Sequence, residues 1–133
     1  MSLSFRAAAA ASLTLALTAS VSAQPYPTQT VRVVVAYAPG GTGDIVARLI
    51  AVPLAAALGQ NVVVENRAGA TGAIGTQAVV QAAPDGHTIL CSISTTYVMN
   101  RVMLKNPGYD MDKDLTLVSV IPGQGLLLIA SRQ

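Results

Sequence analysis

The sequence predicts an α/β protein with a doubly wound, mostly parallel sheet. Three observations support this fold class. Apolar runs of strand length alternate with helix-length segments, the runs are nearly continuous, and two of them end in glycine-rich loops. Continuous apolar runs are typical of strands that helices cover on both faces. Right-handed crossovers then bring the loops that follow such strands to one edge of the sheet. We expect the strand order to reverse between the first and third strands.

The first strand-loop-helix unit starts with an apolar run at Val31 and reaches a helix over 45–58. Asp44 directly precedes this helix, and we expect it to be the N-cap. Gly59 suits a left-handed stop at the other end. Pro53 lies inside the helix and is expected to kink it or to disturb one backbone hydrogen bond.

The second unit and the elements after it follow the same pattern. Glycine and proline punctuate the chain between apolar runs, which marks turns and element ends. The expected elements are a strand over 62–64, a glycine-rich loop, a helix over 73–82, a turn over 83–86, a strand over 87–93, a polar loop over 94–96, a short helix over 97–104, a loop over 105–114, and strands over 115–121 and 126–130.

The first 23 residues have the pattern of a secretory signal peptide. Arg6 supplies a positive charge, residues 7–19 are apolar and uncharged, and a small-residue cleavage signature ends at Ala23. The apolar run is too short for a membrane-spanning helix. We therefore expect residues 1–23 to be removed during export to the periplasm, and 24–133 to form one domain.

Composition argues against nucleic acid as a partner and against cofactor chemistry. The formal net charge is +2. Outside the predicted signal peptide the basic residues are scattered singly, so no basic patch would follow a phosphate backbone. The loop around Gly41 and Gly43 resembles a dinucleotide fingerprint only weakly, because its third glycine would fall at Val46. Cys91 is the single cysteine and is expected to be a buried small hydrophobe. We expect no cofactor and no metal.

Catalysis has little support in the sequence. His87 is the single histidine, and we expect it to flank a turn on the surface, at the sheet edge opposite the ligand crevice. Asp110, Asp112 and Asp114 alternate along a polar segment but lack the glycine and glutamate of a calcium loop. The sequence contains no nucleophile motif with a supporting base. We therefore predict that the chain is not an enzyme.

The two glycine-rich loops indicate instead a site for a small anion. Glycine lets backbone N–H groups approach a ligand closely, and helix N-termini favour negative charge. Hydroxyl groups lie in these two loops, on Thr42 and Thr71, and in the polar loop over 94–96 that follows the third predicted strand. Each hydroxyl could simply cap a helix, but their convergence at one edge suits a carboxylate ligand.

The order and spacing of these motifs resemble the extracytoplasmic solute receptors of the tripartite tricarboxylate transporter family, the Bug receptors. The resemblance rests mainly on the segments 39–48, 58–70, 72–75 and 82–86. It implies a periplasmic, two-lobed, type II binding-protein fold that holds di- or tricarboxylates or acidic amino acids and delivers them to membrane transporter subunits. Because the second lobe would follow Gln133, the chain is expected to be the first lobe of a truncated receptor.

The resemblance also implies which residues bind the carboxylate. By position, the candidate ligand-binding residues are Ala38, Pro39, Gly40, Gly41, Thr42, Gly43, Asp44, Gly69, Ala70, Thr71, Gly72, Ser94 and Thr95. Two alternatives to a carboxylate receptor stay open at this point: a remnant that does not bind, and an exported α/β enzyme.

Overall fold

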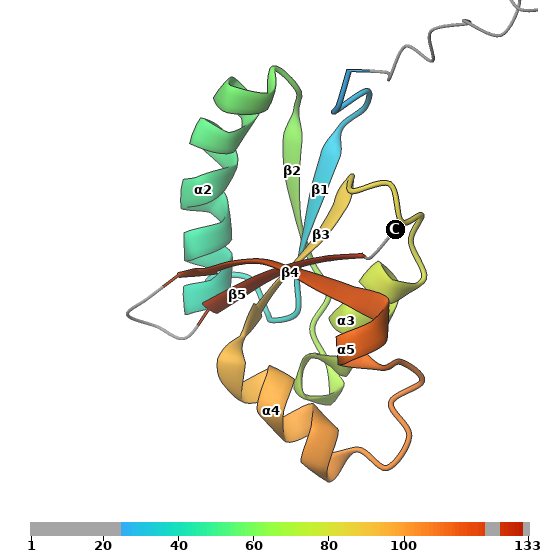
Figure 1. Cartoon of the computed structure of the whole chain (residues 1–133). Helices are drawn as coiled ribbons and strands as arrows, with labels where there is room; N and C mark the ends of the chain where they lie inside the picture. The colour runs from blue at the N-terminus through green and yellow to red at the C-terminus, as the bar shows by residue number, and fades with distance from the viewer. Residues whose placement is uncertain (1–24, 122–125, 132–133) are drawn as a thin grey trace, which may run out of the picture.

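The computed structural model describes residues 25–121 and 126–131 (Figure 1). The central strand β1 (Val31–Val35) pairs in parallel with β2 (Val62–Asn66) on one side and β3 (Thr88–Ile93) on the other. The sheet order is β2-β1-β3-β5-β4, so the expected reversal between the first and third strands is confirmed. The predicted signal peptide lies outside the described residues.

The last strand of the chain runs against the parallel core, and the strand before it runs in the same direction as that core. β5 (Leu126–Ser131) pairs antiparallel with β3, and β4 (Leu115–Ile121) pairs antiparallel with β5 and forms the sheet edge. The sequence pattern placed both strands, but apolar alternation carries no information on strand direction.

Helices cover both faces of the sheet, as expected for a doubly wound fold. Figure 1 shows α2 (Thr42–Leu58) along one face, and α3 (Ala73–Val80) with the one-turn helix α5 (Met111–Asp114) toward the other. Side chains of β1 alternate between these layers. One buried cluster contains Val33, Val35, Ala47 and Cys91, and the other contains Val34, Ala36, Val79, Leu90, Met111 and Leu115.

Helix α2 begins earlier than the sequence pattern indicated. It starts at Thr42, which places Asp44 inside the first turn, so the prediction that Asp44 is the N-cap is wrong. Gly41 holds that position in an extended conformation. The helix runs unbroken past Pro53, whose ring nitrogen carries no proton to donate. Gly59 closes the helix at φ 66°, with its N–H donating to the Ala55 carbonyl at 3.0 Å, as expected.

Two expected loops contain helix. Residues 94–96 are the first turn of α4 (Ser94–Met103), which follows β3 without a connecting loop. Hydroxyl side chains suggested a loop, but they are also common where a helix begins. The segment over 105–114 contains α5, which is capped by Asp110: its side chain accepts a hydrogen bond from the Asp112 N–H at 3.1 Å.

His87 is buried, so the expected surface role is wrong. It is 8% exposed, its Nε2 accepts from the Thr28 N–H at 3.2 Å, and its ring lies 5.0 Å from that of Tyr26. The short segment before β1 covers it, which a local sequence pattern does not reveal. Its position just before β3, away from the carboxyl ends of the strands, is as expected.

Cys91 is completely buried, as expected, and burial raises the pKa of its thiol to about 11.

Among the helices in the described part of the chain, none combines the length and apolar character needed to cross a bilayer.

Candidate functional site

Three helices begin at the carboxyl edge of the parallel strands. Helix α2 follows β1, and α4 directly follows β3. Helix α3 follows β2 through a loop that ends in the one-turn 3-10 helix η1 (Ala70–Gly72). Their N-cap residues are Gly41, Gly72 and Ile93, and none of the three provides a side-chain capping hydrogen bond. The first N–H groups of a helix have no partner within the helix, and the helix dipole is positive there. The edge therefore offers uncapped backbone donors of the kind that bind anions.

A hollow of about 280 Å³ opens at this edge, beside the start of α2. It is lined by Tyr37, Gly41, Thr42, Gly43 and Ile93. Three of these were predicted ligand-binding residues, whereas Tyr37 and Ile93 were missed because neither carries a recognisable binding signature. The predicted residues Ala38, Pro39 and Gly40 are exposed on the loop that leads into α2.

The second glycine-rich loop has an unusual backbone. Gly69, Ala70, Thr71 and Gly72 have φ values of 135°, 47°, 53° and 90°. The first three of these residues are exposed, and Gly72 is buried. A Cβ on Gly72 would lie 2.8 Å from Thr96 Cγ2, so this position needs glycine for both conformation and space.

The start of α4 connects the two loops. Thr96 is 5% exposed, contacts the second loop at Gly72, and shares a hydrogen bond with the Tyr37 hydroxyl of the first loop. Burial raises the pKa of Tyr37 above its ordinary value. Of the predicted residues here, Ser94 is partly buried in the first turn of α4, and Thr95 follows it in that turn.

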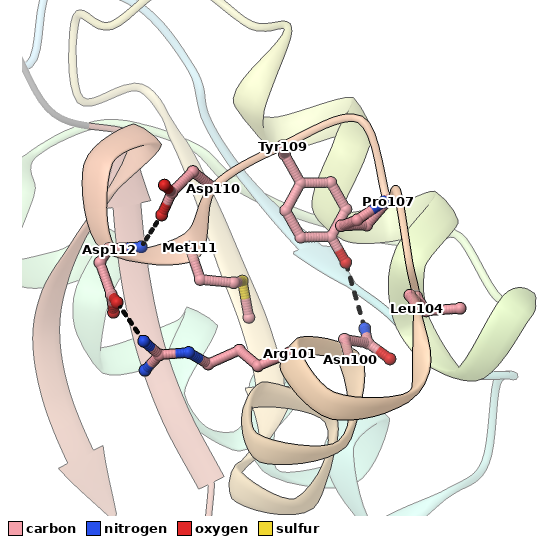
Figure 2. A pocket seen from close by; sticks show the side chains of 8 residues that line it. All are labelled: Asn100, Arg101, Leu104, Pro107, Tyr109, Asp110, Met111 and Asp112. Atoms are coloured by element: carbon pink, nitrogen blue, oxygen red, sulfur yellow. Dashed lines mark hydrogen bonds and ion pairs between the residues drawn. The ribbon is translucent and has the colours of Figure 1, made fainter.

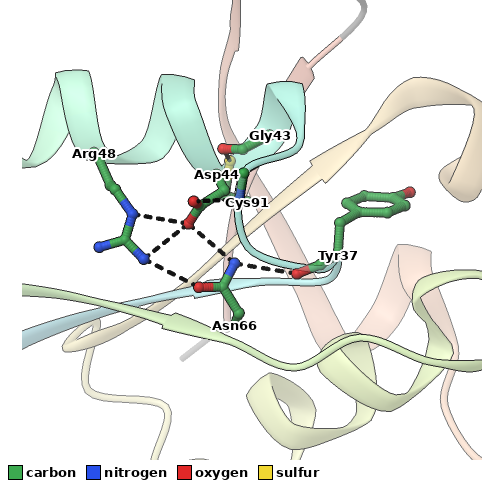
Figure 3. Close-up of polar contacts among 7 residues, drawn as sticks. Tyr37, Gly43, Asp44, Arg48, Asn66 and Cys91 are labelled. Carbon is green, nitrogen blue, oxygen red and sulfur yellow. Dashed lines mark hydrogen bonds and ion pairs between the residues drawn. The ribbon is translucent and has the colours of Figure 1, made fainter.

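The carboxylate of Asp44 is the centre of a polar network (Figure 3). Its Oδ2 accepts from the Gly40 N–H at 2.9 Å. Its Oδ1 accepts from Arg48 Nε at 3.0 Å and from Asn66 Nδ2 at 3.0 Å. The same Asn66 nitrogen donates to the Tyr37 carbonyl at 3.1 Å. The network thus ties the first loop to α2 and to the end of β2.

One part of this network could be found in the sequence. Arg48 follows Asp44 by four positions, the spacing that places side chains on one helix face. The Asn66 contact crosses 22 positions of the chain, so only the parallel pairing of β1 with β2 brings it into range. The dinucleotide interpretation, which the sequence supports only weakly, would need an acidic residue near the end of β2 to bind a ribose, but Glu65 there pairs with Arg32 and Arg67 at 2.7 Å.

We expect the Asp44 network to stabilise the folded state above the unfolded pKa of 3.8 and to lose this contribution toward a pH of about 2. The Arg48 guanidinium, the Gly40 N–H and the Asn66 amide lower the pKa of Asp44 from 3.8 to about 2. A lowered folded-state pKa stabilises the fold above the unfolded pKa, and that contribution disappears as pH falls through the folded value. Unfolding free energies measured by denaturant titration between pH 4 and pH 2 should therefore decline more steeply in the wild type than in Asp44→Asn. Parallel profiles would contradict this assignment.

A second hollow, of about 300 Å³, lies between α4 and α5 (Figure 2). The positively charged side chain that lines this hollow, Arg101, is already paired, because its Nη2 lies 2.5 Å from Asp112 Oδ2. Asp112 also accepts from the Tyr97 hydroxyl at 2.5 Å. This hollow therefore offers no free positive charge to an anion. Within residues 25–121 and 126–131, no three metal-ligating side chains gather into a possible ion site.

A parallel α/β sheet with helix N-termini at the carboxyl edge of its strands is the usual setting for a ligand crevice. Residues 46–133 match the family described as tripartite tricarboxylate transporter family receptor. The chain belongs to this family.

Relatives and solved structures agree with this assignment. The chain is 39% identical over 102 residues to protein BugT of Bordetella pertussis, covering 76% of this chain and 31% of BugT. Its structure is similar to that of MatC from Rhodopseudomonas palustris, solved with bound malate, with TM-score 0.67, 41% identity, and coverage of 71% of this chain and 32% of MatC. A second R. palustris protein, solved with adipate, gives TM-score 0.68 and 38% identity over 72% of this chain and 32% of that one. The chain thus spans about a third of the length of these relatives.

Proposed function

We propose that residues 24–133 form the first lobe of a periplasmic solute-binding receptor that holds a small carboxylate for a tripartite tricarboxylate-type membrane transporter. In this proposal, residues 1–23 are the cleaved signal peptide. The observation that carries the binding function is the convergence of three helix N-termini without side-chain caps at one sheet edge. Family membership supports the receptor role and favours binding over catalysis.

The proposed ligand is a dicarboxylate, a tricarboxylate or an acidic amino acid. Malate and adipate, which two similar structures contain, are both dicarboxylates. Backbone N–H groups at the starts of α2 and α3 would hold one carboxylate, with the hydroxyl of Thr42 beside them. The single hydroxyl proton of Thr71 already has acceptors within the protein. Both oxygens of Asp44 already accept hydrogen bonds within the protein. We therefore assign Asp44 the role of positioning the loop, since its own charge would repel an anion.

Binding by this lobe alone is expected to be weak. Two-lobed receptors bury most of a ligand's surface when they close, which strengthens the charged contacts by excluding water. One lobe provides one wall of such a cleft. We expect dissociation constants for malate and adipate on the order of millimolar, a range accessible to titration by NMR.

Gly41→Ala tests the proposed site. Gly41 has φ −76°, which alanine adopts without strain, and the nearest atom to the added methyl is the Ala38 carbonyl oxygen at 3.4 Å. The methyl would occupy the rim of the hollow, where a ligand must approach the backbone closely. We expect affinity for malate to fall about tenfold, equivalent to about 1.4 kcal/mol, while the melting temperature stays near that of the wild type.

Gly59→Ala is the matched control. Gly59 has φ 66° at the far end of α2, with open space around it. Alanine there should lower thermal stability through backbone strain and leave malate affinity unchanged. Unchanged affinity in a folded Gly41→Ala variant would place the ligand elsewhere.

A further inference from the structure

Asn100 is a buried amide whose partners lie outside its own helix. It belongs to α4, is 2% exposed, and its Nδ2 donates to the Tyr109 hydroxyl at 3.1 Å (Figure 2). Its Oδ1 lies 3.1 Å from Thr71 Oγ1, in the second glycine-rich loop. Burying an amide is unfavourable unless its polar atoms find partners. Asn100 therefore joins the second loop to the segment that follows α4.

The second loop needs support from outside its own backbone. Ala70 and Thr71 both adopt the left-handed region, which side chains other than glycine rarely occupy, and the two residues are consecutive. Such strain persists only where surrounding structure holds it, and it is concentrated at functional sites. The Thr71 hydroxyl has two acceptors in reach, its neighbour's carbonyl at 2.7 Å and Asn100 Oδ1 at 3.1 Å. Asn100 supplies the contact from a separate element.

We infer that Asn100 is a positioning residue that holds the 69–72 loop in its left-handed conformation and so directs that loop's backbone N–H groups toward the ligand. The inference rests on the proposed carboxylate-binding function. Asn100 is absent from the lining of the hollow beside α2, so it would act through Thr71 rather than by touching the ligand. The chemistry is specific: it requires an amide or another polar group of similar reach at position 100.

Three substitutions separate this role from simple packing. Asn100→Leu keeps the approximate size of the side chain and removes both hydrogen bonds. Thr71→Val removes the hydroxyl and with it the bonds to Asn100 and to the Ala70 carbonyl, on an exposed residue whose replacement leaves the core intact. Tyr109→Phe removes the other partner of the amide and serves as the control, because the contact between Asn100 and Thr71 remains.

The primary readout is NMR of the loop in the 133-residue chain without ligand. Three-bond couplings and intraresidue NOEs between the amide and α protons report φ for Ala70 and Thr71. We expect both residues to leave the left-handed region in Asn100→Leu and Thr71→Val, with Tyr109→Phe like the wild type. Left-handed φ values retained in folded Thr71→Val and Asn100→Leu would overturn the inference, whether or not ligand binds.

Malate titration gives the second readout. Asn100→Leu and Thr71→Val should each weaken binding about fivefold, and the double variant should be no weaker than either single one, because both remove the same link. Additive losses would contradict the shared link. A wild-type chain that binds neither malate nor adipate would count against the proposed function, while the loop measurements would still decide the role of Asn100. If Asn100→Leu does not fold, Thr71→Val alone decides both readouts.

Discussion

Gly75→Val is expected to destabilise the fold by about 3 kcal/mol, the upper end of the range for overpacking a core. Gly75 lies in α3, where the helix crosses the end of β1. A Cβ at this position would lie 2.8 Å from the Ala36 Cα and 2.9 Å from the Arg67 carbonyl oxygen. Both are backbone atoms, so no side-chain rotation can relieve the contact. Better helix propensity returns only about 0.5 kcal/mol, which is too little to offset the clash.

Gly41→Val provides the control for stability. It makes the same substitution at an extended residue whose nearest atom would be 3.4 Å away. Chemical denaturation followed by circular dichroism should show a large loss of unfolding free energy for Gly75→Val and little change for Gly41→Val. Equal stability of the two variants would mean that α3 does not pack this closely against β1.

Asp44→Ala is expected to have the largest effect on ligand binding. The substitution leaves the Gly40 N–H without its acceptor and removes the carboxylate partner of the Arg48 guanidinium, which keeps only its bond to Asn66 Oδ1. Asn66 loses one of the two acceptors of its amide nitrogen. The first loop should then lose its fixed geometry, and malate affinity should fall by about tenfold or more.

Asp110→Ala is the matched carboxylate control. Asp110 also accepts a backbone hydrogen bond and pairs with a cation, Lys113, at 3.0 Å, but it caps α5 rather than the first loop. Malate titrations should show near wild-type affinity for Asp110→Ala and a loss for Asp44→Ala. Equal affinities would show that the first loop keeps its shape without the network.

The fold class was predictable because the information is local. Apolar runs and glycine positions define β1, β2 and β3 and the order of units, and right-handed crossovers then fix the reversal at β1. Helix starts were harder to predict. α2 and α4 begin without side-chain caps, so the usual N-terminal signal is missing, and polar residues 94–96 were interpreted as loop.

The sequence was enough to place the two glycine-rich loops at one sheet edge, but not to predict the contacts that support them. The glycines and hydroxyls of the two loops are visible in the sequence. Asn66, Thr96 and Asn100 act across 22 to 59 positions, where only the folded chain brings them to the loops. Glycines also differ in role in a way that the sequence hides. Gly41 has a φ available to any residue, whereas Gly72 is fixed by its φ and by Thr96.

Valine at Gly72 therefore has a different expected outcome from valine at Gly41. The sequence pattern alone predicts that both variants lose binding and remain folded. The clash at Gly72 with Thr96 implies that stability falls there as well. Binding data from Gly72 variants thus need a stability measurement beside them.

The most direct test of a carboxylate site at the shared edge of β1, β2 and β3 is an NMR titration of the chain with malate, read at each backbone amide. Glycerol serves as the uncharged control. We predict saturable shifts at the amides of residues 40–43 and 69–72, with smaller ones at 94–96, and none with glycerol. Absence of shifts in these loops at tens of millimolar malate, or shifts centred instead on the hollow between α4 and α5, would contradict the proposed site.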